Sequence, residues 1–94
     1  MATIAERVER GVRLLNRKKG RRWYRRIDLE WLNLAEPCRC IVGQLYGDYM
    51  RGIRELGVDG LDEGFTTTKS FPALTLHWKR RIRQLLRAEK AQPR

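Results

Sequence analysis

The chain has 94 residues and carries 21 Lys and Arg against 11 Asp and Glu, a formal net charge of +10. This length makes one small domain, and the hydrophobic fraction of 41% is enough for its core but leaves little spare. No apolar run reaches membrane-spanning length and the first residues lack the apolar centre of a signal peptide, so we expect neither membrane insertion nor secretion.

The positive charge is concentrated at the two ends of the chain. Residues 1–26 carry ten Lys and Arg against two acidic residues, and residues 69–94 carry eight against one. Residues 27–68 reverse the balance, with three Arg against eight acidic residues. Basic ends of this kind favour contact with a polyanion or with an acidic partner surface.

The first expected element is a helix over about residues 4–18. Thr3 and Glu6 have the spacing of a capping box, and Gly20 is a typical stop. The apolar residues between them recur at helical spacing: Ile4, Val8, Val12 and Leu15. Arg10, Arg13 and Arg17 lie together on another face of this helix.

Residues 17–26 contain seven basic residues in ten, with Trp23 and Tyr24 among them. We expect a helical turn here. The following segment, 27–35, alternates in part between apolar and polar residues, but the chain offers no partner strand. A short helix capped by Asp28 and an extended segment lying on the core are both consistent with it.

The stretch 38–49 is the central element, with apolar residues at helical spacing and Pro37 suited to its first turn. Gly43 and Gly47 lie four residues apart on one helical face, which indicates that another backbone approaches there. Asp48 is placed to cap a second helix over Tyr49–Leu56, ended by Gly57. One kinked helix and two abutting helices both fit this pattern.

Residues 58–69 are expected to form a loop, because glycines and threonines interrupt any period, with Leu61 and Phe65 as its anchors. The last helix should begin near Ser70, with Pro72 in its first turn. Its apolar residues recur at helical spacing: Phe71, Leu74, Trp78, Ile82 and Leu85. A separate stripe is basic: Lys79, Arg83, Arg87 and Lys90.

Together these elements predict one all-α domain over residues 1–94, a small bundle of three main helices with one or two short ones. We expect an ordered core over about residues 3–88 and a basic C-terminal tail over residues 89–94. The predicted core residues are Val8, Val12, Leu15, Ile41, Val42, Leu45, Leu74, Trp78, Ile82 and Leu85.

Few residues in the sequence indicate catalysis or metal binding. Cys38 and Cys40 flank Arg39, which suits a reactive thiol or a metal ligand, but structural zinc usually needs four ligands and a wider cysteine spacing. The alternative is that at least one cysteine is a small buried hydrophobe. His77 is the single histidine and is interpreted as a residue on the surface of a helix or at the edge of its buried face, since no nucleophile motif accompanies it. We predict no enzyme activity, no metal and no cofactor, and two cysteines without a disulfide framework favour the cytoplasm.

The basic segments carry the functional hypothesis. Lys and Arg neutralise phosphates, and aromatic side chains among them can stack on bases, although Trp23 can equally belong to the core. We predict contact with DNA or RNA through residues 17–26 and 79–90, whereas a solvated charged face is the plain alternative. The predicted contact residues are Arg17, Lys18, Lys19, Arg21, Arg22, Trp23, Tyr24, Arg25, Arg26, Lys79, Arg80, Arg83 and Arg87.

The string Cys40-Ile41-Val42-Gly43-Gln44-Leu45-Tyr46-Gly47-Asp48-Tyr49 resembles a block in small uncharacterised proteins of actinobacteria and their bacteriophages. Arg26-Ile27-Asp28-Leu29, Gly64-Phe65 and Trp78 are also similar, so the resemblance covers most of residues 4–82. It implies a phage or actinobacterial origin and action in a bacterial cytoplasm, and it transfers no functional residue. It also raises a second hypothesis, a phage effector that binds a bacterial host protein and modulates it.

Overall fold

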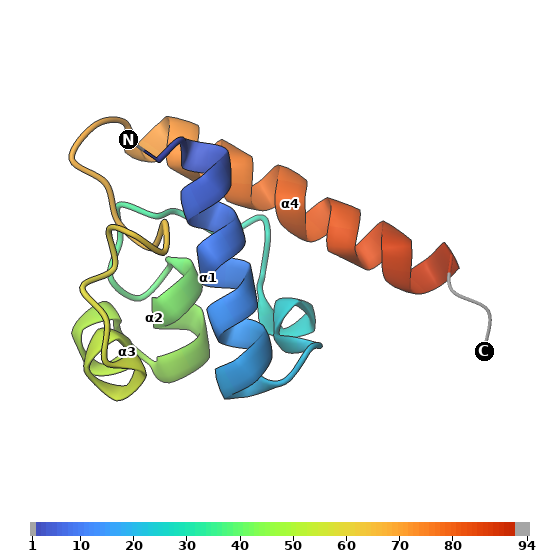
Figure 1. The fold of residues 1–94 in the computed structure, drawn as a ribbon, viewed down its shortest axis with the longest axis horizontal. Coiled ribbons are helices and arrows are strands. Elements are labelled where there is room, and N and C mark those ends of the chain that lie inside the picture. Colours follow the sequence, from blue (N-terminus) through green and yellow to red (C-terminus); the bar gives the residue numbers. More distant parts are fainter. Residues whose placement is uncertain (1, 92–94) are drawn as a thin grey trace.

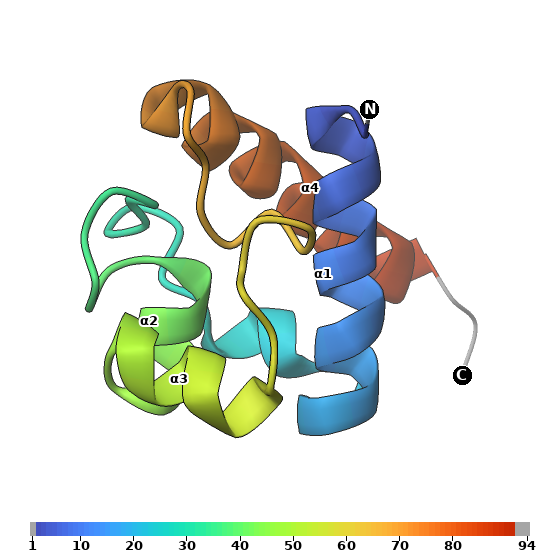
Figure 2. The same ribbon diagram turned by 60° about the vertical axis from the view of Figure 1, so that its left-hand side comes forward.

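The computed structural model describes residues 2–91, in which helices dominate and strands are absent. In chain order the elements are α1 (Ile4–Lys19), the 3-10 turn η1 (Trp23–Arg26), α2 (Ile41–Tyr46), α3 (Tyr49–Leu56) and α4 (Phe71–Ala91). Helix α1 crosses α4, while the short helices α2 and α3 lie side by side on the other side of the molecule (Figures 1 and 2). The prediction of an all-α fold is confirmed.

Helix α1 begins with the predicted capping box. The backbone N–H of Glu6 donates to Thr3 Oγ1 over 3.1 Å, and the backbone N–H of Thr3 donates to Glu6 Oε1 over 3.2 Å. Both bonds satisfy donors that the first helical turn leaves without a partner. The helix ends at Gly20, whose φ of 84° is readily adopted only by glycine.

The hydrophobic core is centred on the indole of Trp78 in α4. Its ring stacks on Phe65 with 6.0 Å between centroids and meets the edge of Trp23 at 6.1 Å. Its Nε1–H donates to the carbonyl oxygen of Gly64 over 2.6 Å, so the loop before α4 is fixed to the core. A Cβ atom at Gly11 of α1 would overlap this loop and the indole ring, which explains a glycine within the helix.

Eight of the ten predicted core residues are buried, and the other two, Leu45 and Leu85, are partly buried and pack against the core. Phe65 is buried and anchors its loop as expected, whereas Leu61 remains half-buried. The core also includes residues outside the predicted set: Leu14, Trp23, Tyr24, Ile27, Leu32, Leu34, Cys40 and Leu56.

Segment 27–35 lies on the core through Ile27, Leu32 and Leu34, but it is neither a short helix nor extended throughout, because turns occupy residues 29–31 and 34–35. Asp28 does not cap a helix, because its Oδ1 accepts hydrogen bonds from the backbone N–H groups of Glu30 and Trp31 in a turn. Beyond that turn Leu32 and Leu34 are buried, and the backbone N–H of Leu34 donates to Thr75 Oγ1 of α4 over 3.0 Å.

The predicted start of the central helix at Pro37 is wrong, because α2 begins at Ile41 and Pro37 lies in the preceding turn. Cys40 caps the helix, since its Sγ accepts the backbone N–H of Gly43 at 3.2 Å. A Cβ atom at Gly43 would overlap the carbonyl oxygen of Pro37, so the expected close approach of another backbone is confirmed there.

Gly47 has a different role from the close approach that we expected of it. A Cβ atom at Gly47 would meet no atom of a non-neighbouring residue within 4 Å, and the φ of 101° at this glycine ends α2. The central stretch therefore forms two abutting helices, and α3 begins with the predicted cap, in which Asp48 Oδ1 accepts the backbone N–H of Arg51 at 3.0 Å.

Helix α4 begins after Ser70, whose Oγ accepts the backbone N–H of Ala73 at 3.2 Å. It continues to Ala91, so residues 89–91 of the predicted tail are helical, and residues 92–94 lie outside the described part of the chain. Its C-terminal end projects past α1 (Figure 1), and Glu89 there contacts Arg25 of η1. No helix within residues 2–91 is both long and apolar enough to cross a membrane.

Candidate functional site

A hollow of about 760 Å³ lies between the second half of α1, the turn at residues 20–24 and the end of α4. We call it the basic groove, because its wall carries four arginines: Arg13, Arg17, Arg21 and Arg22. The rest of the wall consists of Asn16, Tyr24, Leu85, Ala88 and Glu89. Arg17, Arg21, Arg22 and Tyr24 belong to the predicted contact residues, so the structure brings four of these thirteen together here.

The local fold explains why these arginines converge. Arg13 and Arg17 are four residues apart in α1 and therefore lie on one helical face. The chain reverses after Gly20, which brings residues 21 and 22 back beside that face. Trp23 fixes the turn, because its Nε1–H donates to Asn16 Oδ1 of α1 over 2.9 Å.

The two aromatic residues of the basic segment are turned inward. Trp23 is 1% exposed and Tyr24 is 8% exposed, and their rings meet edge to face at 5.8 Å. Trp23 therefore belongs to the core, and the expectation that these rings stack on exposed bases is wrong. Burial raises the pKa of the Tyr24 phenol, and its hydrogen bond with the nearby Glu89 carboxylate also raises it.

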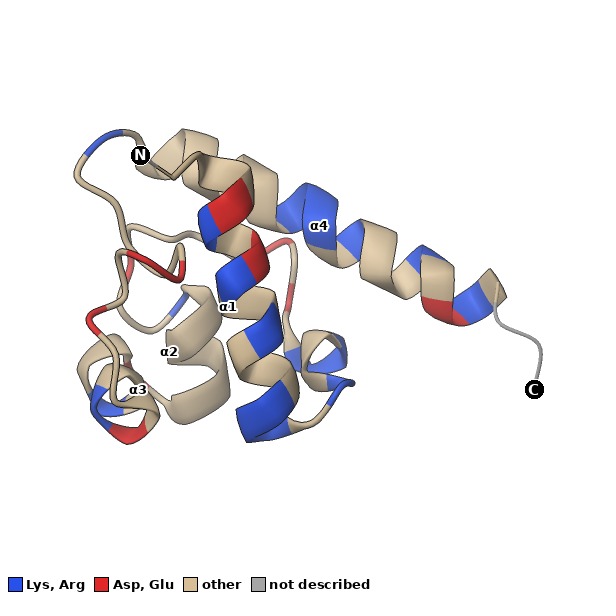
Figure 3. Ribbon diagram, viewed as in Figure 1, with Lys and Arg blue, Asp and Glu red and all other residues tan. Residues whose placement is uncertain are grey.

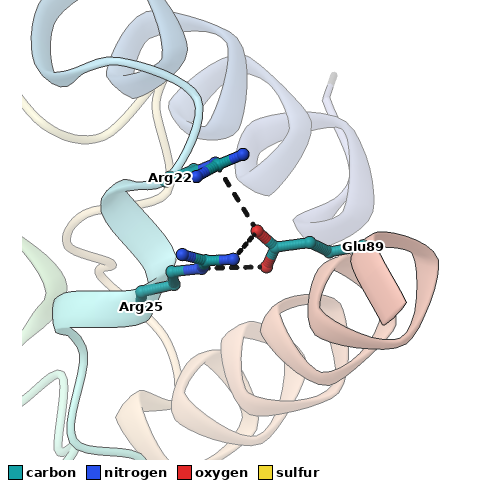
Figure 4. A network of polar contacts seen from close by, with 3 residues as sticks. All are labelled: Arg22, Arg25 and Glu89. Atoms are coloured by element: carbon teal, nitrogen blue, oxygen red, sulfur yellow. Dashed lines mark hydrogen bonds and ion pairs between the residues drawn. The ribbon is translucent and has the colours of Figure 1, made fainter. Parts of the chain in front are cut away.

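Glu89 of α4 contributes the one carboxylate in the wall of the groove. The guanidinium of Arg25 contacts both of its oxygens, with Nε donating to Oε2 over 3.1 Å, and Arg22 Nε lies 3.6 Å from Oε1 (Figure 4). The hydrogen bond from Arg25 is the main reason that the pKa of Glu89 lies below its usual range.

Most of the other predicted basic residues lie outside the groove. Lys18, Arg26, Arg80, Arg83 and Arg87 are exposed along α1, η1 and α4, which Figure 3 shows as blue bands. Lys19 places its Nζ 4.3 Å from the centre of the Tyr46 ring. Lys79 lines a separate hollow of about 440 Å³ beside Arg39 and Leu76. The two basic ends of the chain therefore do not merge into one site.

The sequence-based prediction missed three polar residues of the groove: Arg13, Asn16 and Glu89. Arg13 was detectable, because it lies on the same helical face as Arg17. Glu89 was detectable only as the single acidic residue of the last 26, and no local pattern indicated that it faces residues 22 and 25.

The two free cysteines lie in different surroundings. Cys40 is buried and caps α2, and burial raises the pKa of its thiol, which favours the neutral form. Cys38 is exposed. At least one cysteine is thus a small buried residue, as one alternative predicted. His77 is half-buried on α4, and among residues 2–91 no cluster of His, Cys, Asp and Glu has a geometry that could hold a metal.

The chain matches no protein-family model, and no curated protein or solved structure is significantly similar to it. Any function assigned to it therefore has to be inferred from its surface.

Proposed function

We propose that the protein binds nucleic acid, and that the phosphate backbone of the nucleic acid lies along the basic groove. The observation that carries this proposal is the convergence of Arg13, Arg17, Arg21 and Arg22 on one hollow. No carboxylate among residues 2–91 lies within ion-pair distance of Arg13, Arg17 or Arg21. Their charges are available to phosphates, and each contact releases counterions from the nucleic acid.

The burial of the aromatic residues determines the type of recognition in this proposal. Without exposed rings at residues 23 and 24, the groove offers phosphate contacts and no platform on which bases stack. Phosphate contacts orient a protein on nucleic acid but carry no sequence information directly. We therefore expect binding that tolerates sequence and depends steeply on salt.

The test compares two variants with the same change in net charge. In the groove variant, Arg13, Arg17 and Arg21 are replaced by Gln. In the control variant, Arg51, Arg54 and Lys69, which are exposed and lie outside the groove, are replaced by Gln. Affinity for labelled DNA and RNA duplexes of random sequence is measured by fluorescence anisotropy over a range of salt concentrations.

The groove variant should lose most of its affinity, and its salt slope should fall by about 0.7–0.9 for each phosphate contact removed. The control variant should lose much less, because its charges act only over distance and salt screens them. Equal losses in both variants would mean that only net charge matters. Unchanged binding in the groove variant would mean that the groove is only a solvated charged face and does not contact nucleic acid.

A second candidate function, docking on a bacterial host protein, is favoured by a different surface. Trp31 is 46% exposed and the guanidinium of Arg39 lies 5.7 Å from its ring centre. Leu76, also 46% exposed, lines a hollow together with Arg39. Exposed Trp and Arg side chains are typical of the centre of protein interfaces. A Trp31→Ala variant that keeps nucleic-acid binding but no longer binds the bacterial host protein that the wild type binds would support this function.

Both functions describe a binding protein and no enzyme. The resemblance at residues 40–49 supports, as part of the same proposal, a phage or actinobacterial origin and action in the bacterial cytoplasm. A substrate turnover that is lost when Cys38 or His77 is replaced would overturn the non-enzymatic part of it.

A further inference from the structure

Glu89 occupies a position that its own helix disfavours. It lies two residues before the end of α4, where the helix dipole leaves partial negative charge, so a carboxylate there is unfavourable within the helix. It is also the only acidic residue among the last 26 of the chain. The reason for a carboxylate at this position must therefore lie in its partners outside α4.

The charged partners are Arg22 and Arg25, which approach the carboxylate from the turn after α1 and from η1 (Figure 4), and the Tyr24 phenol is its neutral hydrogen-bond partner. The Glu89 side chain is 19% exposed, whereas those of Arg22 and Arg25 are 73% and 52% exposed. The anion is thus largely enclosed, while both guanidinium groups remain accessible from solvent.

The two oxygens of the Glu89 carboxylate are held differently. Oε2 accepts the hydrogen bond from Arg25, and the lowered pKa shows that the surroundings favour the charged carboxylate on balance. Oε1 is shielded from solvent and accepts no well-aligned hydrogen bond, although both arginines lie within ion-pair distance of it. Both guanidinium groups thus converge on an oxygen whose lost hydration is not fully replaced, and a phosphate oxygen could take its place.

Two guanidinium groups that converge on one oxyanion form an arrangement that also suits a phosphate. Guanidinium groups bind carboxylates and phosphates through the same parallel N–H donors. The neighbouring arginines of the basic groove, Arg13, Arg17 and Arg21, lie next to this pair and carry no carboxylate of their own.

We infer that Arg22 and Arg25 form a phosphate subsite of the basic groove, which the Glu89 carboxylate fills in the free protein. A phosphate of the bound nucleic acid takes the place of the carboxylate, so Glu89 competes with the ligand and lowers its affinity. This inference rests on the proposed function. A purely structural Glu89 that orients the two arginines would have the opposite effect, because its loss would weaken binding.

The test is a Glu89→Gln variant with Glu55→Gln as its matched control. Glu55 forms an exposed ion pair with Arg51 at 3.4 Å, away from the groove. Each variant therefore removes one carboxylate that is ion-paired with arginine. Affinity for a random-sequence DNA duplex is measured at one salt concentration, after circular dichroism has shown that both variants are folded. Glu89→Gln should bind about two- to fivefold more tightly than Glu55→Gln, the range of an ion pair whose arginines remain exposed.

A double variant tests whether the increase in affinity of Glu89→Gln depends on Arg25. In Arg25→Gln/Glu89→Gln the net charge equals that of the wild type, and the increase in affinity should disappear because one half of the subsite is missing. Tighter binding by Glu89→Gln together with its loss in the double variant supports the inference. A gain that survives in the double variant overturns it.

The remaining outcomes separate this inference from the proposed function. If the wild type binds and Glu89→Gln equals Glu55→Gln, the proposed function stands and the subsite inference fails. Weaker binding by Glu89→Gln also overturns the inference and makes Glu89 a positioning residue. If neither the wild type nor any variant binds DNA or RNA duplexes, the proposed function and the inference fail together.

Discussion

The acidic and the basic residues of this chain are used in different ways on its two sides. On the side of α2, α3 and the loop 57–70, acidic side chains accept hydrogen bonds from the backbone. Asp48 caps α3, Asp59 accepts the N–H of Leu61 at 2.9 Å, and Glu63 accepts the N–H of Gly60 at 3.2 Å. These carboxylates hold turns and helix ends in place.

On the side of α1, η1 and α4, the basic residues have few such partners. Within the described part of the chain, two ion-pair groups involve them: Arg81 with Glu9, and Arg22 and Arg25 with Glu89. The remaining predicted arginines of this side, such as Arg17, Arg21 and Arg83, have no carboxylate of residues 2–91 within ion-pair distance.

The difference separates charges that support the fold from charges available for binding. A carboxylate that caps a helix stabilises the protein by about 0.5–2 kcal/mol, and its loss should be visible in unfolding experiments. An exposed arginine without a partner contributes little to stability, and several together repel each other. A group of exposed arginines without ion-pair partners is best explained by a binding partner of the protein. The proposed function is therefore based on the arginines and on none of the acidic residues.

The largest effect is expected for Trp23→Ala, which removes a core ring from beneath the basic segment. The ring is 1% exposed and contacts both Trp78 and Tyr24, so its loss should cost about 3–5 kcal/mol of unfolding free energy, measured by urea denaturation. The neighbouring exposed Arg21→Ala should change stability by less than about 0.5 kcal/mol. A stable Trp23→Ala variant that binds nucleic acid poorly would instead restore the base-stacking interpretation.

The sequence was informative about helix boundaries where the capping residue is of a type common at N-caps, which Cys40 of α2 is not. Thr3 with Glu6, Asp48 and Ser70 each bond to a backbone N–H three residues away, so their role can be predicted from spacing alone. The start of α2 was predicted incorrectly because Pro37 suits the first turn of a helix as well as it suits the turn before α2, where it lies. What excludes it there is the contact between its carbonyl group and Gly43, and that contact depends on how the preceding turn folds back.

An intermediate effect is expected for Gly43→Ala in α2. Alanine favours helix formation over glycine by about 1 kcal/mol, so a simple helical position would be stabilised. Here the new methyl group overlaps the backbone of residues 37 and 38, which cannot move aside as a flexible side chain can. We expect a net loss of about 1–3 kcal/mol in urea denaturation. Equal or higher stability would show that the turn before α2 is easily displaced.

The candidate site was less predictable than the fold. The sequence located the basic segment, because seven basic residues in ten are visible without a structure. It could not show that Trp23 and Tyr24 face inward, because their partners Asn16, Trp78 and Glu89 come from other elements. For the same reason it could not exclude Lys79, Arg80, Arg83 and Arg87 from the groove, since a helical stripe does not reveal which part of its length faces a neighbour.

The smallest of these stability effects is expected for Asp48→Ala, and it tests the comparison most directly. Oδ1 of Asp48 accepts the N–H of Arg51 at 3.0 Å, so its removal leaves a first-turn donor of α3 without that partner. We expect a loss of about 1 kcal/mol of unfolding free energy in urea denaturation.

Asp62→Ala is the matched control, because it removes the same charge. Asp62 is exposed and makes no hydrogen bond among the described residues. Its stability should change by less than about 0.5 kcal/mol. Equal losses in the two variants would mean that the acidic side is stabilised by its net charge near the basic side, and the assignment of its carboxylates to backbone capping would then be wrong.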